Sequence, residues 1–210
     1  MKFEDRSFEG LAAALASEAP TPGGGTASAA AGALGAALVS MVLALTLSKE
    51  KFAAAAEELR PVADEAERSG ARFRELMDED AASFDAMAAA RRLPKETDAE
   101  KSARSEAMQA TARHAAEVPM ETARCAAMLL SRVPLVAEKG NPNAASDAGV
   151  AALLLASAAE GALLNVGINL GSIKDPACVQ AMEKETAKIS GDVERLRAQV
   201  IALVRKSFTA

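Results

Sequence analysis

The stretch TASAAAGALGAALVSMVLALTLS, residues 26–48, contains no charged side chain. It follows the loop APTPGGG, residues 19–25, whose prolines and glycines interrupt regular structure. Alanine and leucine favour helix and β-branched residues are few, so a long apolar helix is expected here. A second mostly uncharged stretch, residues 150–173, is interrupted only by Glu160, Asn165 and Asn169. Helices that are apolar on all sides lie at the centre of a bundle or at a subunit interface.

The remainder of the 210-residue chain also shows helical periodicity, with apolar residues three and four positions apart. Ser7 is placed to cap a short first helix, and Asp175 to cap a last amphipathic helix. Pro61 is expected to bend its helix or start a new one, and Pro119 to open a helix that runs to about Glu138. The sequence therefore predicts an all-α, single-domain helical bundle over residues 1–210, with two long uncharged central helices completed by a second subunit.

Composition excludes several classes of function. The net charge of −5 and the absence of a basic stripe with aromatic residues argue against a nucleic-acid partner. Cys125 and Cys178 are far apart and form no disulfide framework, so we expect two thiols in a reducing, cytoplasmic setting. The first ten residues are mixed in charge and do not have the pattern of a secretion signal.

A membrane anchor is the main structural alternative, because residues 26–48 are long enough to cross a bilayer. The front half of this stretch is mostly alanine, glycine and serine, which gain little in lipid, and it lacks flanking aromatic residues. We therefore expect no membrane partner, and detergent partitioning would distinguish the two interpretations.

The glycine-rich loop, with Pro22, Gly23, Gly24 and Gly25, is the first candidate site. No Gly-Lys-Ser/Thr follows it and no strand is expected before it, so it is neither a P-loop nor a dinucleotide fingerprint. Two interpretations remain open. The bare amides at a helix start can receive a carboxylate, a phosphate or a flat polar ring, or the loop is a tight turn that permits close helix packing.

Two carboxylates are candidates for acid–base chemistry. Asp80 falls on the helix face of Met77, Phe84 and Met87, and an acid on an apolar face is costly unless it is paired or functional. Asp147 stands at the start of the second uncharged helix, where an ordinary helix-start acid is the competing interpretation.

Asn165 and Asn169 are four residues apart in an otherwise apolar stripe, so their amides need partners, either neighbouring helix groups or a polar ligand. His114 is the single histidine and lies in a charged segment, where it is expected to be solvated. With one histidine and two scattered cysteines, no metal site is expected.

Five short stretches follow one another along essentially the whole chain: APTPGGGTA from Ala19, GALGAALVSMV from Gly32, DAASFD from Asp80, GNPNAASD from Gly140 and LNVGINL from Leu164. Each is weak alone, but in this order they resemble the formiminotransferase-cyclodeaminase family, with its free-standing bacterial methenyltetrahydrofolate cyclohydrolases. One departure is Phe52, in LSKEKF, where that family often has a tyrosine.

The resemblance implies an all-helical homodimer with a folate in a long crevice and one-carbon chemistry that uses no metal or redox cofactor. A tetrahydrofolate derivative is then the substrate. By the same resemblance, Asn141 joins the substrate-binding candidates, and Lys49 and Lys51 are expected to meet the glutamate tail. Asn165 and Asn169 would bind the pterin edge.

The expected activity is hydrolysis of 5,10-methenyltetrahydrofolate to 10-formyltetrahydrofolate, with Asp80 or Asp147 as acid–base and the other stabilising the amidinium charge. We prefer this reaction because no transferase domain accompanies the sequence to deliver a formimino substrate. The alternatives are a formiminotetrahydrofolate cyclodeaminase that releases ammonia, and a helical dimer that binds folate without catalysis.

Overall fold

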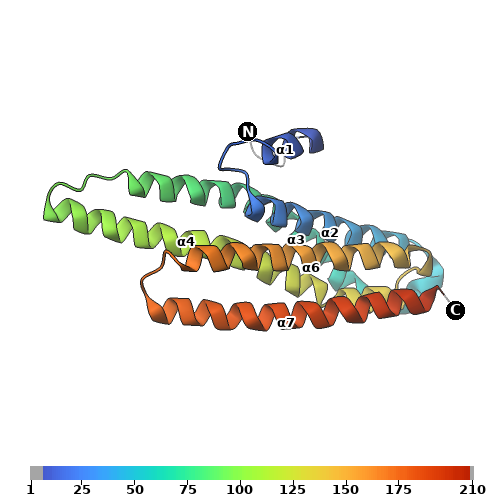
Figure 1. Ribbon diagram of the computed structural model, residues 1–210. Helices are drawn as coiled ribbons and strands as arrows, with labels where there is room; N and C mark the ends of the chain where they lie inside the picture. The colour runs from blue at the N-terminus through green and yellow to red at the C-terminus, as the bar shows by residue number, and fades with distance from the viewer. Residues whose placement is uncertain (1–6, 209–210) are drawn as a thin grey trace.

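Residues 7–208 are described by the computed structural model, and their long helices pack side by side (Figure 1). No strand occurs among these residues, so the prediction of an all-α bundle is confirmed. The helices are α1 (Phe8–Leu15), α2 (Gly24–Leu47), α3 (Ala56–Arg91), α4 (Asp98–Leu130), α5 (Val133–Lys139), α6 (Ala145–Leu170) and α7 (Pro176–Ser207), with short 3₁₀ helices η2 (Glu50–Ala55) and η3 (Pro142–Ala144).

Helix α2, the uncharged stretch, packs against α6 and α3. Its small residues let neighbouring helices approach closely. A Cβ on Gly161 of α6 would lie only 2.5 Å from Ser28 Oγ, and one on Gly32 would lie 2.5 Å from the ring of the fully buried Phe73. Contacts this short are not tolerated in a packed core, so the glycines are required by the helix spacing.

One face formed by α2 and α6 stays exposed although it is apolar. Leu34, Met41 and Leu45 on α2 are 54%, 38% and 42% exposed, and Leu164 and Ile168 on α6 are 77% and 78% exposed. We call this surface, which also includes Val150 and Leu153, the α2–α6 face. Exposed apolar residues gathered on one surface are typical of interaction sites.

Two helical segments, Gly24–Leu47 and Pro142–Leu170, are long and apolar enough to cross a membrane. Their apolar windows are 39% and 50% buried within the protein, and core helices of soluble proteins meet the same criteria. Length and composition are therefore weak evidence for a membrane protein.

The expectation of a helix beginning at Pro119 was wrong, because α4 continues through this residue and ends at Leu130. Proline lacks an amide hydrogen and leaves the carbonyl four residues earlier, that of Ala115, without its helical partner. The side-chain amide of Asn169 donates to this carbonyl at 2.6 Å and so replaces the missing bond. Pro61 likewise lies inside α3, near its exposed first turns.

Both predicted caps are confirmed. Ser7 Oγ accepts a hydrogen bond from the amide of Gly10, and Asp175 Oδ1 accepts from the amides of Ala177 and Cys178. Helix α4 begins with a reciprocal capping box between Thr97 and Glu100, a start signal that stabilises a helix of 33 residues at its exposed end.

Candidate active site

Helix α2 begins without a capping side chain of its own. Its N-cap is Gly23, and its first turn contains no acidic residue. The side chain that reaches this helix start is Asp80 of α3, whose Oδ2 accepts a hydrogen bond of 2.9 Å from the hydroxyl of Thr26. A carboxylate from a neighbouring helix therefore occupies the position where α2 presents amides and the positive end of its dipole.

Gly25 is required for this approach. A Cβ on Gly25 would lie 2.6 Å from Asp80 Cγ, and one on Gly24 would lie 3.2 Å from Asn165 Nδ2. None of the described glycines has a positive φ angle, so the backbone conformation does not explain why the loop contains three glycines. The glycines therefore permit the close packing of Asp80 and Asn165 from the same chain, as the tight-turn interpretation expects. Binding of a ligand by the loop stays a prediction.

Burial raises the pKa of Asp80 above its usual range, while the Thr26 hydroxyl and the Thr26 main-chain amide act to lower it. The sequence-based placement of Asp80 on an inward face is confirmed by these contacts. A carboxyl group with a raised pKa at a cavity is a candidate for proton transfer.

Asn165 and Asn169 lie on α6 beside the glycine loop and are held through their NH₂ groups. Asn165 Nδ2 donates to the carbonyl of Gly161 at 2.8 Å, and Asn169 Nδ2 donates to the Ala115 carbonyl that Pro119 leaves open. Their Oδ1 atoms accept no hydrogen bond from the part of the chain that the structure describes. The two amides therefore offer acceptors to a ligand.

These groups surround one cavity of about 210 Å³. It lies between the glycine loop, α3, α4 and α6, and its lining consists of Pro20, Thr21, Gly23, Gly24, Gly25, Asp80, Ser83, Phe84, Met87, Ala115, Asn165, Ile168 and Asn169. Apart from Asp80, none of these residues carries a charge. A single carboxylate thus faces neutral walls with two amide acceptors.

The other predicted residues lie at the opposite end of the bundle. Asp147, in the first turn of α6, is 18 residues before Asn165, or about 27 Å at 1.5 Å per helical residue. Lys49 and Lys51 follow the far end of α2 and are exposed. Within one subunit, the structure does not bring these residues to the cavity.

Asn141 also lies at this far end and is engaged in holding the chain. Its main-chain amide donates to Thr46 Oγ1 at 2.8 Å, its Nδ2 donates to the Leu45 carbonyl at 3.4 Å, and its Oδ1 accepts from the Asn143 amide at 3.2 Å. Its side chain is buried, so these bonds explain its presence without a ligand.

Sequence reasoning gave no role to Thr26, Ser83 or Ile168. Thr26 directly follows the triple glycine, but the bond to Asp80 joins residues 54 positions apart, and no local pattern reports such a contact. Ser83 Oγ donates to the main-chain carbonyl of Asp80 and lines the same cavity. Ile168 lies in an apolar stretch, and no sequence signal separates a cavity-lining apolar residue from a core residue there.

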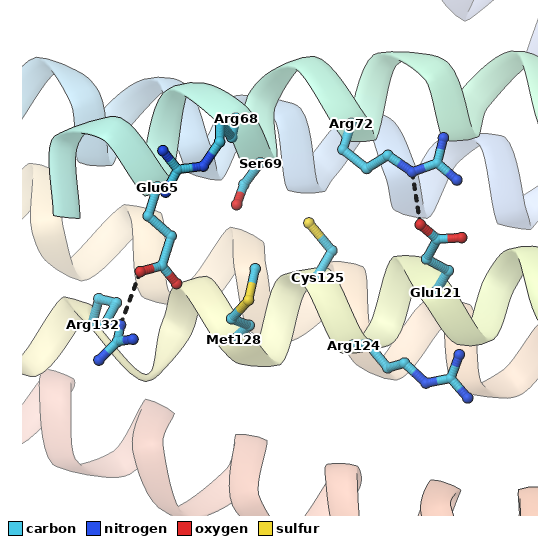
Figure 2. Close-up of a pocket in the computed structure, with 9 residues that line it drawn as sticks. All are labelled: Glu65, Arg68, Ser69, Arg72, Glu121, Arg124, Cys125, Met128 and Arg132. Atoms are coloured by element: carbon cyan, nitrogen blue, oxygen red, sulfur yellow. Dashed lines mark hydrogen bonds and ion pairs between the residues drawn. The ribbon is translucent and has the colours of Figure 1, made fainter. Parts of the chain in front are cut away.

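A larger groove of about 600 Å³ lies between α3 and α4 (Figure 2). It is lined by Arg68, Arg72, Arg124, Arg132, Glu65, Glu121, Ser69, Cys125 and Met128. Ion pairs join its walls, with Arg72 Nε 2.7 Å from Glu121 Oε1 and Arg132 Nε 3.0 Å from Glu65 Oε2. We call this surface the α3–α4 groove. Among residues 7–208, no group of three or more histidine, cysteine or acidic side chains is arranged to hold a metal ion.

The fold is that of a known class of helical enzymes of folate one-carbon chemistry. Residues 7–188 match the family model of formiminotransferase-cyclodeaminase, and the chain belongs to this family. The resemblance seen in the sequence motifs is therefore confirmed.

Individual relatives support the same assignment. The chain is 38% identical over 191 residues to a methenyltetrahydrofolate cyclohydrolase of Methylorubrum extorquens. The aligned region covers 91% of this chain and 92% of that protein. The chain is 34% identical over 206 residues to the mouse formimidoyltransferase-cyclodeaminase, covering 98% of this chain but only 37% of the mouse protein.

A solved structure has the same fold. The crystal structure of formiminotetrahydrofolate cyclodeaminase from Thermotoga maritima superposes with a TM-score of 0.87 at 27% sequence identity, covering 97% of this chain and 98% of that one. The similarity therefore extends through the whole bundle.

Proposed function

We propose that this protein hydrolyses 5,10-methenyltetrahydrofolate to 10-formyltetrahydrofolate, with Asp80 as the group that transfers protons. The observation that carries the proposal is the Asp80 carboxylate, half-buried at a neutral cavity and hydrogen-bonded by Thr26. No second charged residue of the cavity lining neutralises it. A cationic substrate such as the methenyl compound supplies the missing positive charge.

The reaction follows from this arrangement. Asp80 takes a proton from a water molecule as the water oxygen bonds to the carbon between N5 and N10. The bond from this carbon to N5 then breaks while N5 receives the proton from Asp80. The hydroxyl proton leaves to solvent as the carbonyl forms, which balances the charge of the cation. A positioned acid–base group contributes roughly 10²–10⁴-fold to such a step.

The asparagines support binding of the pterin. Because Asn165 and Asn169 are fixed through their NH₂ groups, they offer carbonyl oxygens to the cavity. The pterin edge carries several N–H donors, which these acceptors fit. Pro119 contributes indirectly, since it opens the Ala115 carbonyl that holds Asn169.

The choice of hydrolysis over deamination is supported by the Methylorubrum relative, which aligns over nearly its full length and is named a methenyltetrahydrofolate cyclohydrolase. Cyclodeamination, in which N10 attacks a formimino carbon and ammonia leaves, needs the same acid–base group. It is the alternative that the Thermotoga relative supports.

A homodimer formed through the α2–α6 face completes this proposal. The cavity of about 210 Å³ is smaller than the roughly 300–1,000 Å³ of complete small-molecule sites. Ile168 belongs both to the cavity lining and to the exposed apolar face, so the face continues from the cavity. A two-fold axis across the middle of this face would bring Lys49, Lys51 and Asp147 of the partner subunit towards the cavity.

The oligomeric state tests this part directly. Leu34→Asp places a charge on the α2–α6 face without touching the cavity lining, and we expect a monomer with weakened turnover by light scattering and kinetics. Phe208→Asp, at an exposed residue outside this face, is the control and should remain dimeric. A monomeric wild-type protein with full activity would contradict the shared site.

The activity is tested by offering both substrates to the purified protein. Loss of methenyltetrahydrofolate absorbance reports hydrolysis, and ammonia release from 5-formiminotetrahydrofolate reports deamination. Asp80→Asn is expected to lower kcat by about 10²-fold or more. Asp192→Asn, a matched substitution on α7 outside the cavity lining, should leave it unchanged.

Each outcome has a clear meaning. Full activity of Asp80→Asn would show that the carboxylate mechanism is wrong. Ammonia release without hydrolysis would assign the protein as a cyclodeaminase. Tight folate binding without turnover of either compound would establish a non-catalytic folate-binding protein.

A further inference from the structure

We propose that Thr26 is a positioning residue, whose hydroxyl fixes the orientation of the Asp80 carboxylate and favours its ionised form. This inference rests on the proposed function, because Asp80 is the proton-transfer group there. It assigns a role in the reaction to a residue at the start of α2 that does not itself line the cavity.

The geometry at the start of α2 supports this role. Thr26 is fully buried, and its Oγ1 lies 2.9 Å from Asp80 Oδ2. On the other side, the carboxyl group lies against Gly25, where a Cβ would come within 2.8 Å of Oδ2 and 2.6 Å of Cγ. The carboxylate is thus confined between a hydrogen-bond donor and bare main chain, with little freedom to rotate.

No other hydrogen bond from a side chain to this carboxylate is found among the described residues. Ser83 carries the hydroxyl group nearest to Asp80 along the chain, but it donates to the main-chain carbonyl of Asp80 instead. The Thr26 hydroxyl is therefore the side-chain donor that opposes the cost of burying the charge. A hydrogen bond to a charged group is stronger than one between neutral groups, and its loss leaves the charge uncompensated.

The described lining of the cavity contains no second titratable group that would obscure this effect. The glycine loop contributes Pro20, Thr21 and glycines, α4 contributes Ala115, and α6 contributes Asn165, Ile168 and Asn169. The remaining residues from α3 are Ser83, Phe84 and Met87. Among the described lining residues, Asp80 is therefore the group whose protonation would lower activity as the pH falls.

The burial that raises the pKa of Asp80 is opposed by the Thr26 hydroxyl and amide. Removal of the hydroxyl leaves burial and the amide, so the pKa of Asp80 should rise further. More of the enzyme would then hold Asp80 protonated at a given pH, and in this form the residue cannot accept a proton from water.

The test compares Thr26→Val, which keeps the size and removes the donor, with Thr26→Ser, which keeps the donor. For Thr26→Val we expect the acid limb of the kcat/KM profile to move to higher pH by about one unit or more. Thr26→Ser should keep the limb at its wild-type position. Thr26→Ala supplies a second donor-free variant, and circular dichroism reports folding of each.

A second measurement is independent of turnover. The ¹³C signal of the Asp80 carboxyl, assigned by its absence in Asp80→Asn, should titrate at higher pH in Thr26→Val than in the wild type. An unmoved limb and an unmoved carboxyl titration in a folded donor-free variant would overturn the inference. An equal loss of kcat in Thr26→Ser and Thr26→Val at all pH values would do the same, because it indicates a structural role that does not depend on the donor.

Failure of the proposed function gives a different result. If Asp80→Asn keeps full activity, Asp80 does not transfer the proton, whatever Thr26 does to its titration. If Asp80→Asn loses activity while Thr26→Val leaves the acid limb in place, the function stands and only the role of Thr26 is wrong.

Discussion

The α3–α4 groove and the Asp80 cavity differ in how their charges are compensated. The groove is the larger, at about 600 Å³ against about 210 Å³. Its carboxylates are paired: the hydrogen bond from Arg72 holds the pKa of Glu121 below its usual range, and Arg132 Nε lies 3.0 Å from Glu65 Oε2. In the cavity, burial instead raises the pKa of Asp80.

This difference favours the Asp80 cavity as the site of the proposed reaction, although the α3–α4 groove is larger. A charge that is already paired within the protein gains little from a ligand, and the paired groove is explained by stability alone. A carboxyl group held at a cost in a neutral cavity gains from a cationic substrate and from proton transfer. Three substitutions separate these two kinds of environment.

The largest effect is expected from Gly25→Ala. The new Cβ would come within 2.6 Å of Asp80 Cγ, so the carboxylate must move away from the start of α2. Because a displacement of about 1 Å costs roughly 10²-fold in an acid–base step, kcat/KM should fall by about this factor or more. Steady-state kinetics on the folded variant measure the change.

Gly191→Ala is the matched control, because a Cβ there meets no atom within 4 Å. In the middle of α7 the alanine should stabilise the helix by about 0.5–1 kcal/mol and leave turnover unchanged. Equal activity of the two variants would show that the position of Asp80 does not matter for turnover.

The sequence predicted the position of Asp80 because helical periodicity decides which side of a helix a residue faces. It also indicated that something approaches the triple glycine closely. Periodicity does not decide which residue of another helix stands opposite, so the hydrogen bond between Thr26 and Asp80 could not be foreseen. The predicted helix over residues 26–48, in contrast, already implies that Lys49 lies at the end of α2 away from the glycine loop.

Pro119 shows a second limit of sequence-based prediction. Proline is read as a helix breaker because it lacks an amide hydrogen. In this fold Asn169, from a helix that follows later in the chain, supplies the missing donor to Ala115. The local rule was overridden by a tertiary contact, and the same contact orients a candidate ligand-binding amide.

A smaller effect is expected from Glu121→Gln in the α3–α4 groove. This change removes the charge that Arg72 pairs with at 2.7 Å, and exposed pairs of this kind contribute about 0.2–1 kcal/mol. Since the pKa of Glu121 is lowered in the folded protein, its contribution is present at neutral pH and is lost as pH falls through that value. Urea unfolding at neutral and acid pH should show the variant less stable than wild type only at neutral pH, with activity retained. Lost activity in a stable variant would give the groove a part in turnover.

The smallest change, and the one that distinguishes the two sites most directly, is the effect of Asp80→Asn on stability. Because the folded protein raises the pKa of Asp80, folding becomes less favourable as pH rises from the usual aspartate value of about 3.9 through the raised value. The wild type therefore carries a cost at neutral pH that the neutral asparagine avoids. We expect Asp80→Asn to be at least as stable as wild type at neutral pH, and any advantage to vanish below about pH 4, by urea unfolding. At neutral pH, the expected change in the free energy of unfolding has the opposite sign to the change expected for Glu121→Gln. If Asp80→Asn is instead less stable only at neutral pH, the charge of Asp80 stabilises the start of α2. The carboxylate of the cavity would then be compensated within the protein, as the carboxylates of the α3–α4 groove are.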